Sequence, residues 1–303
     1  MGDWPEVAIV ATPDTASMLE EWLFLAGAVS VTYQDKNDQP ILEPAPGEIL
    51  LWNDISLIGL FERAQDPDSL ISALHLAAYS SGLAIPDYEL RVLPDAVWER
   101  AWMQDYHPMQ FGPKLWVCPS HKSPPDANAV NICLDPGLAF GTGTHATTAL
   151  CLSWLGRHTA TQRKPFNGAT VVDFGCGSGV LAIAVAKLGA KTVFAVDIDE
   201  QAILATGQNA GENGVLDQLI ISQPGALILD NADMIVANIL FEPLTTLSER
   251  FANMLRVGGM LLMSGILEEQ VDELHMSYNS WFEFEPATVR NGWALIIATR
   301  RPK

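Results

Sequence analysis

A glycine-rich segment followed at a fixed distance by an acidic residue limits the folds that this chain can adopt. Residues 171–179 read VVDFGCGSG, and a second apolar run, VFAVD, ends in Asp197. Asp173 precedes Asp197 by 24 residues, close to the roughly 20 residues of one β-α-β unit. Glycines let a ligand approach the backbone closely, and the acid can accept hydrogen bonds from a ribose. The pattern predicts a site for an adenosine-containing cofactor; a tight turn that binds nothing is the alternative.

The spacing of the glycines distinguishes two classes of cofactor. A dinucleotide fingerprint requires glycine or alanine three residues after its second glycine, but here Gly177 is followed at that distance by Val180. The motif is G-x-G-x-G behind Asp173. It favours S-adenosyl-L-methionine, which has no phosphate to direct at a helix N-terminus. We expect Asp173 to lie near the methionine ammonium of this cofactor and Asp197 to bind its ribose.

Segments that flank the motif predict the rest of an α/β domain. The predicted helices span 180–188, closed by Gly189, and 199–213. Residues 232–238 form a short apolar run, which is typical of a strand buried on both faces. This run ends in Asn238, which we expect at the carboxyl edge of the sheet, where ligands bind in open α/β folds.

Four sequence blocks carry a resemblance to a known family. They are FGTGTHATT at 140–148, VDFGCGSG at 172–179, VDID at 196–199 and VANIL at 236–240. In this order, over residues 135–265, the chain resembles the bacterial ribosomal protein L-eleven methyltransferases. The first block is the most specific of the four, because general methyltransferases lack it.

The resemblance implies a fold, an activity and a set of cofactor contacts. The implied fold is an α/β, Rossmann-like S-adenosylmethionine-dependent methyltransferase domain behind a small N-terminal substrate-recognition domain. The implied activity is methyl transfer to lysine side chains and to the N-terminal amine of that large-subunit ribosomal protein. The implied cofactor contacts are Thr148, Gly175, Asp197 and Asn238. Gly177 follows from the glycine turn itself.

The chain of 303 residues is long enough for two domains. We expect a substrate-recognition domain over 1–93, a linker helix over 94–112 and the methyltransferase domain over 113–303. The first domain is predicted to be α+β, with the order β-α-β-β-α-β, which suggests a ferredoxin-like layer of helices on an antiparallel sheet. Its predicted strands are 7–11, 29–34, part of 48–60 and 88–93. Its predicted helices are 14–26 and one that begins at Asp66 or Asp68 and ends at Tyr79. Trp98, Trp102 and Tyr106 recur every four residues and predict one packed face of the linker helix.

The remaining segments of the second domain give weaker predictions. Residues 115–118 and 130–134 are typical of a hairpin around a proline-rich loop, and 157–167 of a surface loop. A helix is predicted over 243–255 and a strand over 259–264. Two apolar runs, 281–284 and 293–299, predict a terminal antiparallel hairpin.

Charge is concentrated in the N-terminal part of the chain. Residues 1–95 hold 16 acidic and 3 basic residues, whereas the remainder holds 20 and 14. Nucleic-acid binding needs basic contacts to phosphate, so we expect no direct nucleic-acid binding. Such a surface would attract a basic ribosomal protein and raise its encounter rate. Solubility alone is the alternative explanation of this acidity.

Composition also bears on location and on metal content. No apolar run approaches the ~20 residues that span a bilayer, and no secretory signal is apparent at the N-terminus. The four cysteines lack C-x-x-C spacing, so reduced thiols are expected. The six histidines are scattered along the sequence, and no metal site is predicted. We expect a cytoplasmic monomer.

The chemistry of an amine acceptor does not require a dedicated base. Lysine, with a reference pKa near 10.4, is neutral at only about 0.1% near pH 7.4, but burial can lower a lysine pKa by up to 3–5 units. His145 could accept a proton or could shape its loop, so the catalytic residue stays open. Amide and adenine methyltransferases usually resemble Asn-Pro-Pro-aromatic where this chain has Asn238-Ile-Leu-Phe. This difference disfavours those acceptors.

Three other functions remain as alternatives. The chain could be a lysine methyltransferase for a different protein, or an S-adenosylmethionine-binding assembly module without turnover. A nicotinamide-dependent oxidoreductase is the least favoured of the three, because the glycine spacing departs from the dinucleotide fingerprint.

Overall fold

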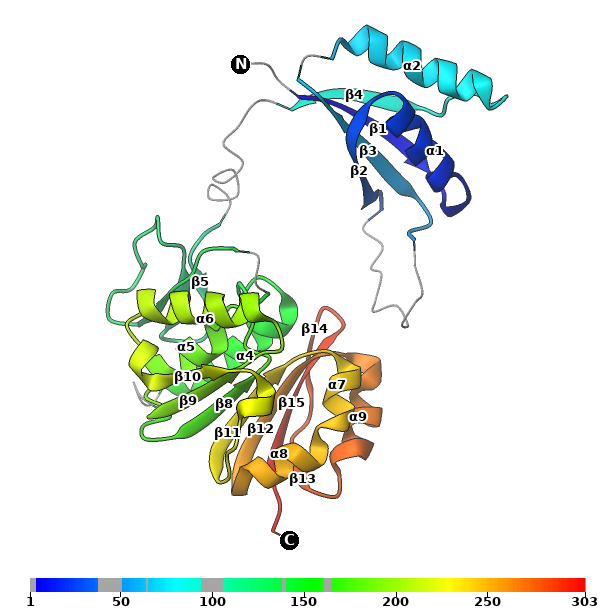
Figure 1. Ribbon diagram of the computed structural model, residues 1–303. Helices are drawn as coiled ribbons and strands as arrows, with labels where there is room; N and C mark the ends of the chain where they lie inside the picture. The colour runs from blue at the N-terminus through cyan, green and yellow to red at the C-terminus, as the bar shows by residue number, and fades with distance from the viewer. Residues whose placement is uncertain are drawn as a thin grey trace. The chain divides into compact units, whose positions relative to one another are not determined.

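The computed structural model describes residues 4–37, 51–63, 65–93, 106–137, 140–160 and 165–302. The chain divides into two compact units, Met1–Ala101 and Trp102–Lys303 (Figure 1). Each unit has its own sheet and its own buried core, and each is described separately below.

The N-terminal unit is a four-stranded antiparallel sheet covered by two helices (Figure 1). Its elements are β1 (Trp4–Ala11), α1 (Pro13–Leu25), β2 (Ala28–Asp35), β3 (Ile55–Phe61), α2 (Pro67–Ser80) and β4 (Tyr88–Leu93). The strand order is β2-β3-β1-β4, and all three pairings are antiparallel. The predicted ferredoxin-like β-α-β-β-α-β domain is therefore confirmed.

Alternation of apolar residues builds the core of this unit. Every second residue of β3, beginning with Ile55, is fully buried, because successive side chains of a strand point to opposite faces. The same face of the sheet receives Leu19 and Leu23 from α1 and Leu70 from α2. The Asp66 carboxylate accepts a hydrogen bond from the Ser69 backbone N–H and so caps α2.

The second unit contains an eight-stranded sheet of mixed direction, in the order β10-β9-β8-β11-β12-β15-β13 with β14 paired to β15. Its strands are β8 (Thr170–Phe174), β9 (Thr192–Val196), β10 (Leu219–Ser222), β11 (Ala232–Asn238), β12 (Leu255–Leu267), β13 (Phe282–Phe284), β14 (Thr288–Arg290) and β15 (Trp293–Arg300). Strands β8 to β12 are mutually parallel, and β15 runs antiparallel to β12. The chain continues from β8 toward one edge and resumes at β11 toward the other, so β8 and β11 flank the point at which the order reverses.

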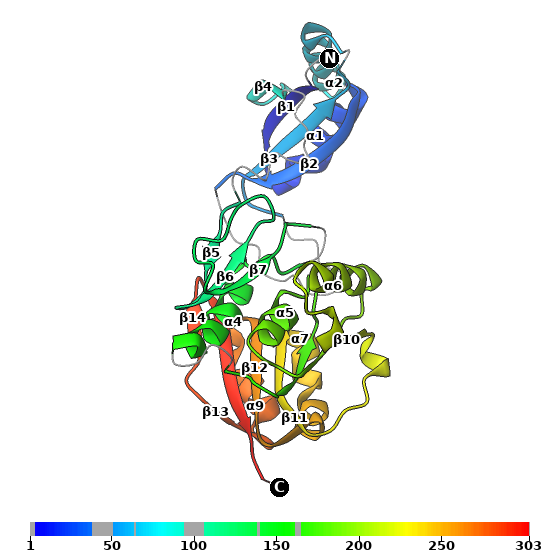
Figure 2. The same ribbon diagram turned by 90° about the vertical axis from the view of Figure 1, so that its left-hand side faces the viewer.

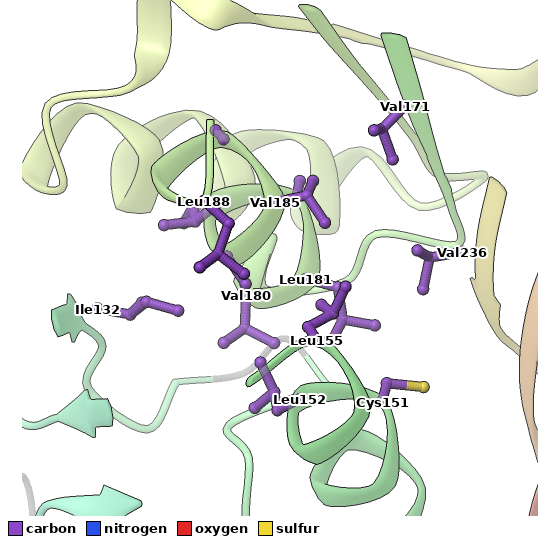
Figure 3. Packing of buried hydrophobic residues seen from close by; sticks show 14 of the residues in the cluster. Ile132, Cys151, Leu152, Leu155, Val171, Val180, Leu181, Val185, Leu188 and Val236 are labelled. Atoms are coloured by element: carbon purple, nitrogen blue, oxygen red, sulfur yellow. The ribbon is translucent and has the colours of Figure 1, made fainter. Parts of the chain in front are cut away.

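Helices cover both faces of this sheet (Figure 2). One layer holds α4 (Ala146–Arg157), α5 (Val180–Lys187) and α6 (Glu200–Glu212), and the other holds α7 (Phe241–Thr246), α8 (Ser248–Met254) and α9 (Val271–Tyr278). Short 3-10 turns are η1 (His158–Ala160), η2 (Leu216–Gln218), η3 (Pro224–Ala226) and η4 (Glu268–Gln270). Figure 3 shows Leu152 and Leu155 of α4 packed with Leu181 of α5. This is the Rossmann-like methyltransferase architecture that the sequence predicted.

The predicted hairpin over 115–134 is wrong in its direction. Strands β6 (Leu115–Cys118) and β7 (Val130–Cys133) pair in parallel, in a small sheet of order β5-β6-β7 with β5 (Met109–Gln110). The segment between β6 and β7 is long enough to carry the chain back to the start of β6, so both strands run the same way. Apolar alternation indicates that a segment is a strand, but it does not give the direction of pairing.

Three other boundaries differ from the predictions. Most of the expected linker helix lies outside the described residues, and 106–112 contain β5 and no helix. The helix expected over 243–255 is two helices that meet at Leu247. The hydroxyls of Thr245 and Thr246 bond backbone carbonyls three residues back, which competes with continued helical bonding. The expected surface loop over 157–167 is in part buried, since Phe166 is 8% exposed.

Candidate cofactor-binding and active site

A cavity of about 610 Å³ opens at the carboxyl edge of the second sheet. It lies where β8, β9 and β11 end, which is the usual ligand site of open α/β folds. Its described lining residues are Phe140, His145, Thr147, Phe174, Gly175, Gly177, Asp197, Ile198, Pro224, Asn238, Ile239, Leu240, Pro243, Thr246, Leu247, Arg250, Gly265 and Trp293. The wall is largely apolar, and Asp197 is its only acid among the described residues.

The turn after β8 can accommodate only glycines at two positions. Gly175 and Gly177 have φ of +84° and +53°, in the left-handed region. A Cβ at Gly175 would lie 2.1 Å from Cγ2 of Ile239, and one at Gly177 would lie 2.5 Å from the carbonyl oxygen of Phe140. The turn therefore brings bare backbone to the cavity wall, as the glycine motif predicted.

Asp197 is fixed in place by two backbone amides. Its Oδ2 accepts a hydrogen bond from the Gly177 N–H at 2.9 Å, and its Oδ1 accepts one from the Asp199 N–H at 3.0 Å. Each carboxylate oxygen keeps further acceptor capacity. A pair of neighbouring hydroxyls on a ligand would find two oriented acceptors here.

Asn238 faces the cavity and Thr148 supports it from behind. The Asn238 Nδ2 donates to the Thr148 Oγ1 at 3.1 Å. Thr148 is fully buried and is not part of the cavity wall, so here it orients Asn238. The Asn238 Oδ1 is buried and has no hydrogen-bond partner among the described residues. It is an acceptor left for a donor on a ligand.

Asp173 does not reach the cavity, contrary to the expectation that it lies near an ammonium. It is 1% exposed, and its Oδ2 accepts a hydrogen bond from the Ala182 N–H of α5 at 2.8 Å. Burial raises the pKa of this carboxyl to about 7. Asp173 therefore ties β8 to the first turn of α5 and holds the glycine turn between them.

The raised pKa of Asp173 predicts a pH-dependent stability. The folded state holds this proton more tightly than the unfolded chain, so ionisation favours unfolding. The free energy of unfolding should therefore fall as pH rises from about 4 to about 7, by up to roughly 1.4 kcal/mol per pH unit from this group. Asp173→Asn should remove that part of the slope in urea titrations between pH 4.5 and 8. Equal slopes for both proteins would contradict the prediction.

The segment 140–145 is pinned to the glycine turn. Ser178 makes two of the contacts, because its N–H donates to the Phe140 carbonyl at 2.8 Å and its Oγ donates to the Gly141 carbonyl at 2.7 Å. The hydroxyl of Tyr106 donates to the Thr142 carbonyl at 2.6 Å. Neither Ser178 nor this role of Tyr106 was predicted from the sequence. Only the serine, inside the motif itself, could have been suspected.

Two roles were predicted for His145, accepting a proton or shaping its loop, and the structure shows the second. It is the N-cap of α4, and its Nδ1 accepts a hydrogen bond from the Thr147 N–H. Its ring lies between Phe140 and Trp293, with centroids at 5.3 and 5.0 Å. Burial lowers the pKa of His145. The Thr147 Oγ1 also lies 2.8 Å from Nδ1, so two groups of Thr147 hold the ring at this nitrogen.

Trp293 and Arg250 are among the cavity residues that were not identified from the sequence. Trp293 comes from β15, which was expected only to pack, and Arg250 comes from α8. Neither belongs to a motif, so only the folded chain brings them to the site.

Within the described residues, no group of three histidine, cysteine or acidic side chains could hold a metal ion. None of the described helices is long and apolar enough to cross a membrane.

The polar groups of the cavity suit an S-adenosylmethionine molecule. Asp197 offers acceptors for ribose hydroxyls, and the unpartnered Asn238 Oδ1 offers one for an ammonium. The glycine turn lines the cavity at Gly175 and Gly177, which carry no side chain. Ile198 and Pro224 give an apolar edge for a flat base.

Known proteins of one family match the chain over nearly its whole length. The sequence model described as "Ribosomal protein L11 methyltransferase (PrmA)" matches residues 3–301. A protein of that name from Nitrosococcus oceani is 46% identical over 298 residues, 98% of this chain and 99% of that protein. Another, from Tolumonas auensis, is 47% identical over 299 residues, with the same shares covered.

A solved structure agrees with these matches. The crystal structure of a ribosomal protein L11 methylase from Lactobacillus delbrueckii subsp. bulgaricus superposes with a TM-score of 0.58 at 32% identity. It covers 65% of this chain and 100% of its own. With the glycine turn, the oriented acid and the cavity at the sheet edge, the chain belongs to the ribosomal protein L11 methyltransferase family and is an S-adenosylmethionine-dependent methyltransferase.

Proposed function

We propose that this methyltransferase modifies lysine side chains and the N-terminal amine of ribosomal protein L11. The names of its relatives support the choice of protein. One observation carries the choice of amine: the cavity wall is largely apolar, and Asp197 is its only acid among the described residues. Such a cavity suits an acceptor that becomes nucleophilic through desolvation alone.

We assign cofactor binding to five residues, of which four contact the cofactor and Thr148 orients one of them. Asp197 accepts from the ribose hydroxyls, and Gly175 and Gly177 let the methionine part lie against backbone. Asn238 accepts from the methionine ammonium through its unpartnered Oδ1, and Thr148 keeps its amide in that orientation. The assignment uses the one buried side-chain acceptor on the described cavity wall that lacks a partner.

When bound, the cofactor supplies a methyl group on a positively charged sulfur. The chain's own contribution is orientation and dehydration. An in-line displacement needs the reacting atoms about 3–3.5 Å apart, and the amine must first lose its proton to solvent. Near pH 7.4 this loss costs lysine roughly 4 kcal/mol. Apolar side chains such as Phe140, Ile239 and Trp293 reduce that cost by disfavouring the charged amine. The amine lone pair then forms the N–C bond as the S–C bond breaks.

Labelling tests the choice of substrate. Purified ribosomal proteins incubated with the enzyme and cofactor carrying a labelled methyl group should yield label on L11 alone. The Asp199→Ala variant, changed outside the cavity wall, should give the same pattern. Cofactor binding without label on any protein would show that the substrate assignment is wrong, and label on another protein would redirect it.

The two kinds of acceptor should respond differently to pH. With substrate well below saturation, the initial rate at a lysine should rise about tenfold per unit between pH 7 and 8, because the neutral fraction of the free lysine does so. The rate at the N-terminal amine should level off near pH 8, since its reference pKa is 7.7–8.0. Mass spectrometry of digested product separates the positions. Identical profiles would mean that a group of the enzyme controls the proton.

The acidity of the N-terminal part supports a basic protein as partner. With 16 acidic and 3 basic residues among residues 1–95, it would repel the RNA surface of an assembled ribosome. We therefore expect free L11 to be methylated faster than L11 in intact subunits, with a difference that shrinks as salt is added. Equal rates on both forms at low salt would contradict this expectation.

A further inference from the structure

Arg250 brings a positive charge into a cavity that must also hold a positively charged sulfur. It extends from α8, in the helix layer opposite the glycine turn's helix, and it lines the cavity with Asp197, Ile198 and Pro224. No described carboxylate forms an ion pair with it. Like charges close together in an apolar site repel strongly. We therefore expect the Arg250 guanidinium to lie away from the sulfur and to bind another group of the ligand.

The sheet order gives that location. Pro224 follows β10 and Asn238 ends β11, and these two strands lie three strand spacings apart in the order β10-β9-β8-β11. At about 4.8 Å per spacing this is roughly 14 Å. Arg250 donates to the Pro224 carbonyl and lies against Phe174 at the end of β8, whereas the methionine end is assigned to Asn238 of β11. With the ribose at Asp197, the base lies at the β9 and β10 side of the cavity, beside Arg250.

The guanidinium of Arg250 is held in place, but only one of its N–H donors has a hydrogen-bond partner among the described residues. Its Cζ lies 5.2 Å from the centroid of the Phe174 ring, and its Nη2 donates to the Pro224 carbonyl. A guanidinium has five N–H donors in a rigid fork. The contacts with Phe174 and Pro224 fix the fork while leaving N–H groups for a ligand, and the ring nitrogens of adenine are acceptors.

We propose that Arg250 recognises the purine of the cofactor by donating a hydrogen bond from its guanidinium to a ring nitrogen. The proposal rests on the ribose assignment to Asp197 made above. Arg250 is then a specificity-determining residue that selects the base, supplied by a helix that carries no part of the glycine motif. A charged donor makes such a bond stronger than a neutral one.

Calorimetric titration with S-adenosylhomocysteine, which binds without turnover, tests the proposal. Arg250→Met keeps the length of the side chain and should weaken binding about ten- to a hundredfold, as expected for a hydrogen bond to a charged group. Arg250→Lys keeps the charge without the fork and should recover only part of the loss. Arg256→Met is the matched control, because Arg256 pairs with Asp233 outside the cavity wall and its loss should leave the affinity unchanged.

Analogues of the ligand show whether Arg250 contacts the base directly or only holds Pro224 in position. Each of 1-deaza-, 3-deaza- and 7-deaza-adenosylhomocysteine lacks one ring nitrogen. One of them should bind the unaltered enzyme about ten- to a hundredfold more weakly than the parent compound, yet bind the Arg250→Met variant no more weakly than the parent does. Such non-additivity shows that the two groups interact.

Three outcomes would overturn the proposal. The first is that Arg250→Met binds the parent compound with full affinity. The second is that the unaltered enzyme binds all three analogues with full affinity. The third is that the affinity lost by the variant and the affinity lost by the analogue add when the two are combined. The second needs no variant, so it holds even if a variant fails to fold. Failure of the ribose assignment is recognised separately, by undiminished binding to an Asp197→Ala variant.

Discussion

Replacing Asp197 by alanine should weaken S-adenosylmethionine binding at least about a hundredfold. The carboxylate is held by the amides of Gly177 and Asp199, so it is already oriented before a ligand arrives. Each charged hydrogen bond to a ribose hydroxyl contributes about 1.5–3 kcal/mol, and two would be lost together. The measurement is calorimetric titration, and Asp197→Asn should fall between the two proteins because it keeps one acceptor.

A neighbouring aspartate provides the control for this prediction. Asp199 caps α6 by accepting a hydrogen bond from the Gln201 N–H at 2.9 Å, and it is not part of the described cavity wall. Asp199→Ala should cost about 1 kcal/mol of stability and leave cofactor affinity nearly unchanged. Undiminished binding by Asp197→Ala would remove the basis of the cofactor-site assignment.

Replacing Gly177 by alanine should damage both stability and cofactor binding. The added Cβ would lie 2.5 Å from the backbone oxygen of Phe140, and the residue has φ of +53°. A left-handed non-glycine residue costs about 1–3 kcal/mol, and the overlap adds about 1–3 kcal/mol. Ser178 donates hydrogen bonds to the carbonyls of Phe140 and Gly141, so segment 140–145 cannot move away without losing those bonds. Thermal unfolding should show the loss, and titration should show weakened binding.

A glycine of α6 makes the matched control. A Cβ at Gly211 would meet nothing within 4 Å, and this position lies inside the helix. Gly211→Ala should therefore stabilise the protein by up to about 1 kcal/mol. If Gly177→Ala behaved like Gly211→Ala, the close approach of segment 140–145 to the turn would not matter for the site.

Local sequence patterns predicted most of the framework but not the details that depend on distant segments. Asp66 and Asp199 begin helices as their capping chemistry requires, and β11 has the predicted bounds. The pairing of β6 with β7 was wrong because strand direction depends on the path of the connecting segment. Asp173 could be assigned to β8, but the direction of its side chain could not be predicted. Because both faces of the sheet are covered, a side chain on either side of the strand is buried.

In the candidate site, too, the residues in local motifs could be predicted and those that depend on distant segments could not. Gly175, Gly177, Asp197 and Asn238 lie in contiguous motifs at strand ends, so the sequence could place them at one edge. Thr148 was expected to touch the cofactor, yet it lies behind Asn238. Its position depends on how α4 packs against β11, which no local pattern encodes. Trp293 and Arg250 reach the cavity only because β15 and α8 fold back beside β12.

The separate core of the N-terminal unit has a consequence for engineering. That core draws only on residues between 7 and 78, with Leu51, Trp52 and Ile85 among the partly buried neighbours, and shares no cluster with the methyltransferase sheet. We therefore expect that a foreign domain could replace the N-terminal unit while the methyltransferase sheet keeps its own core.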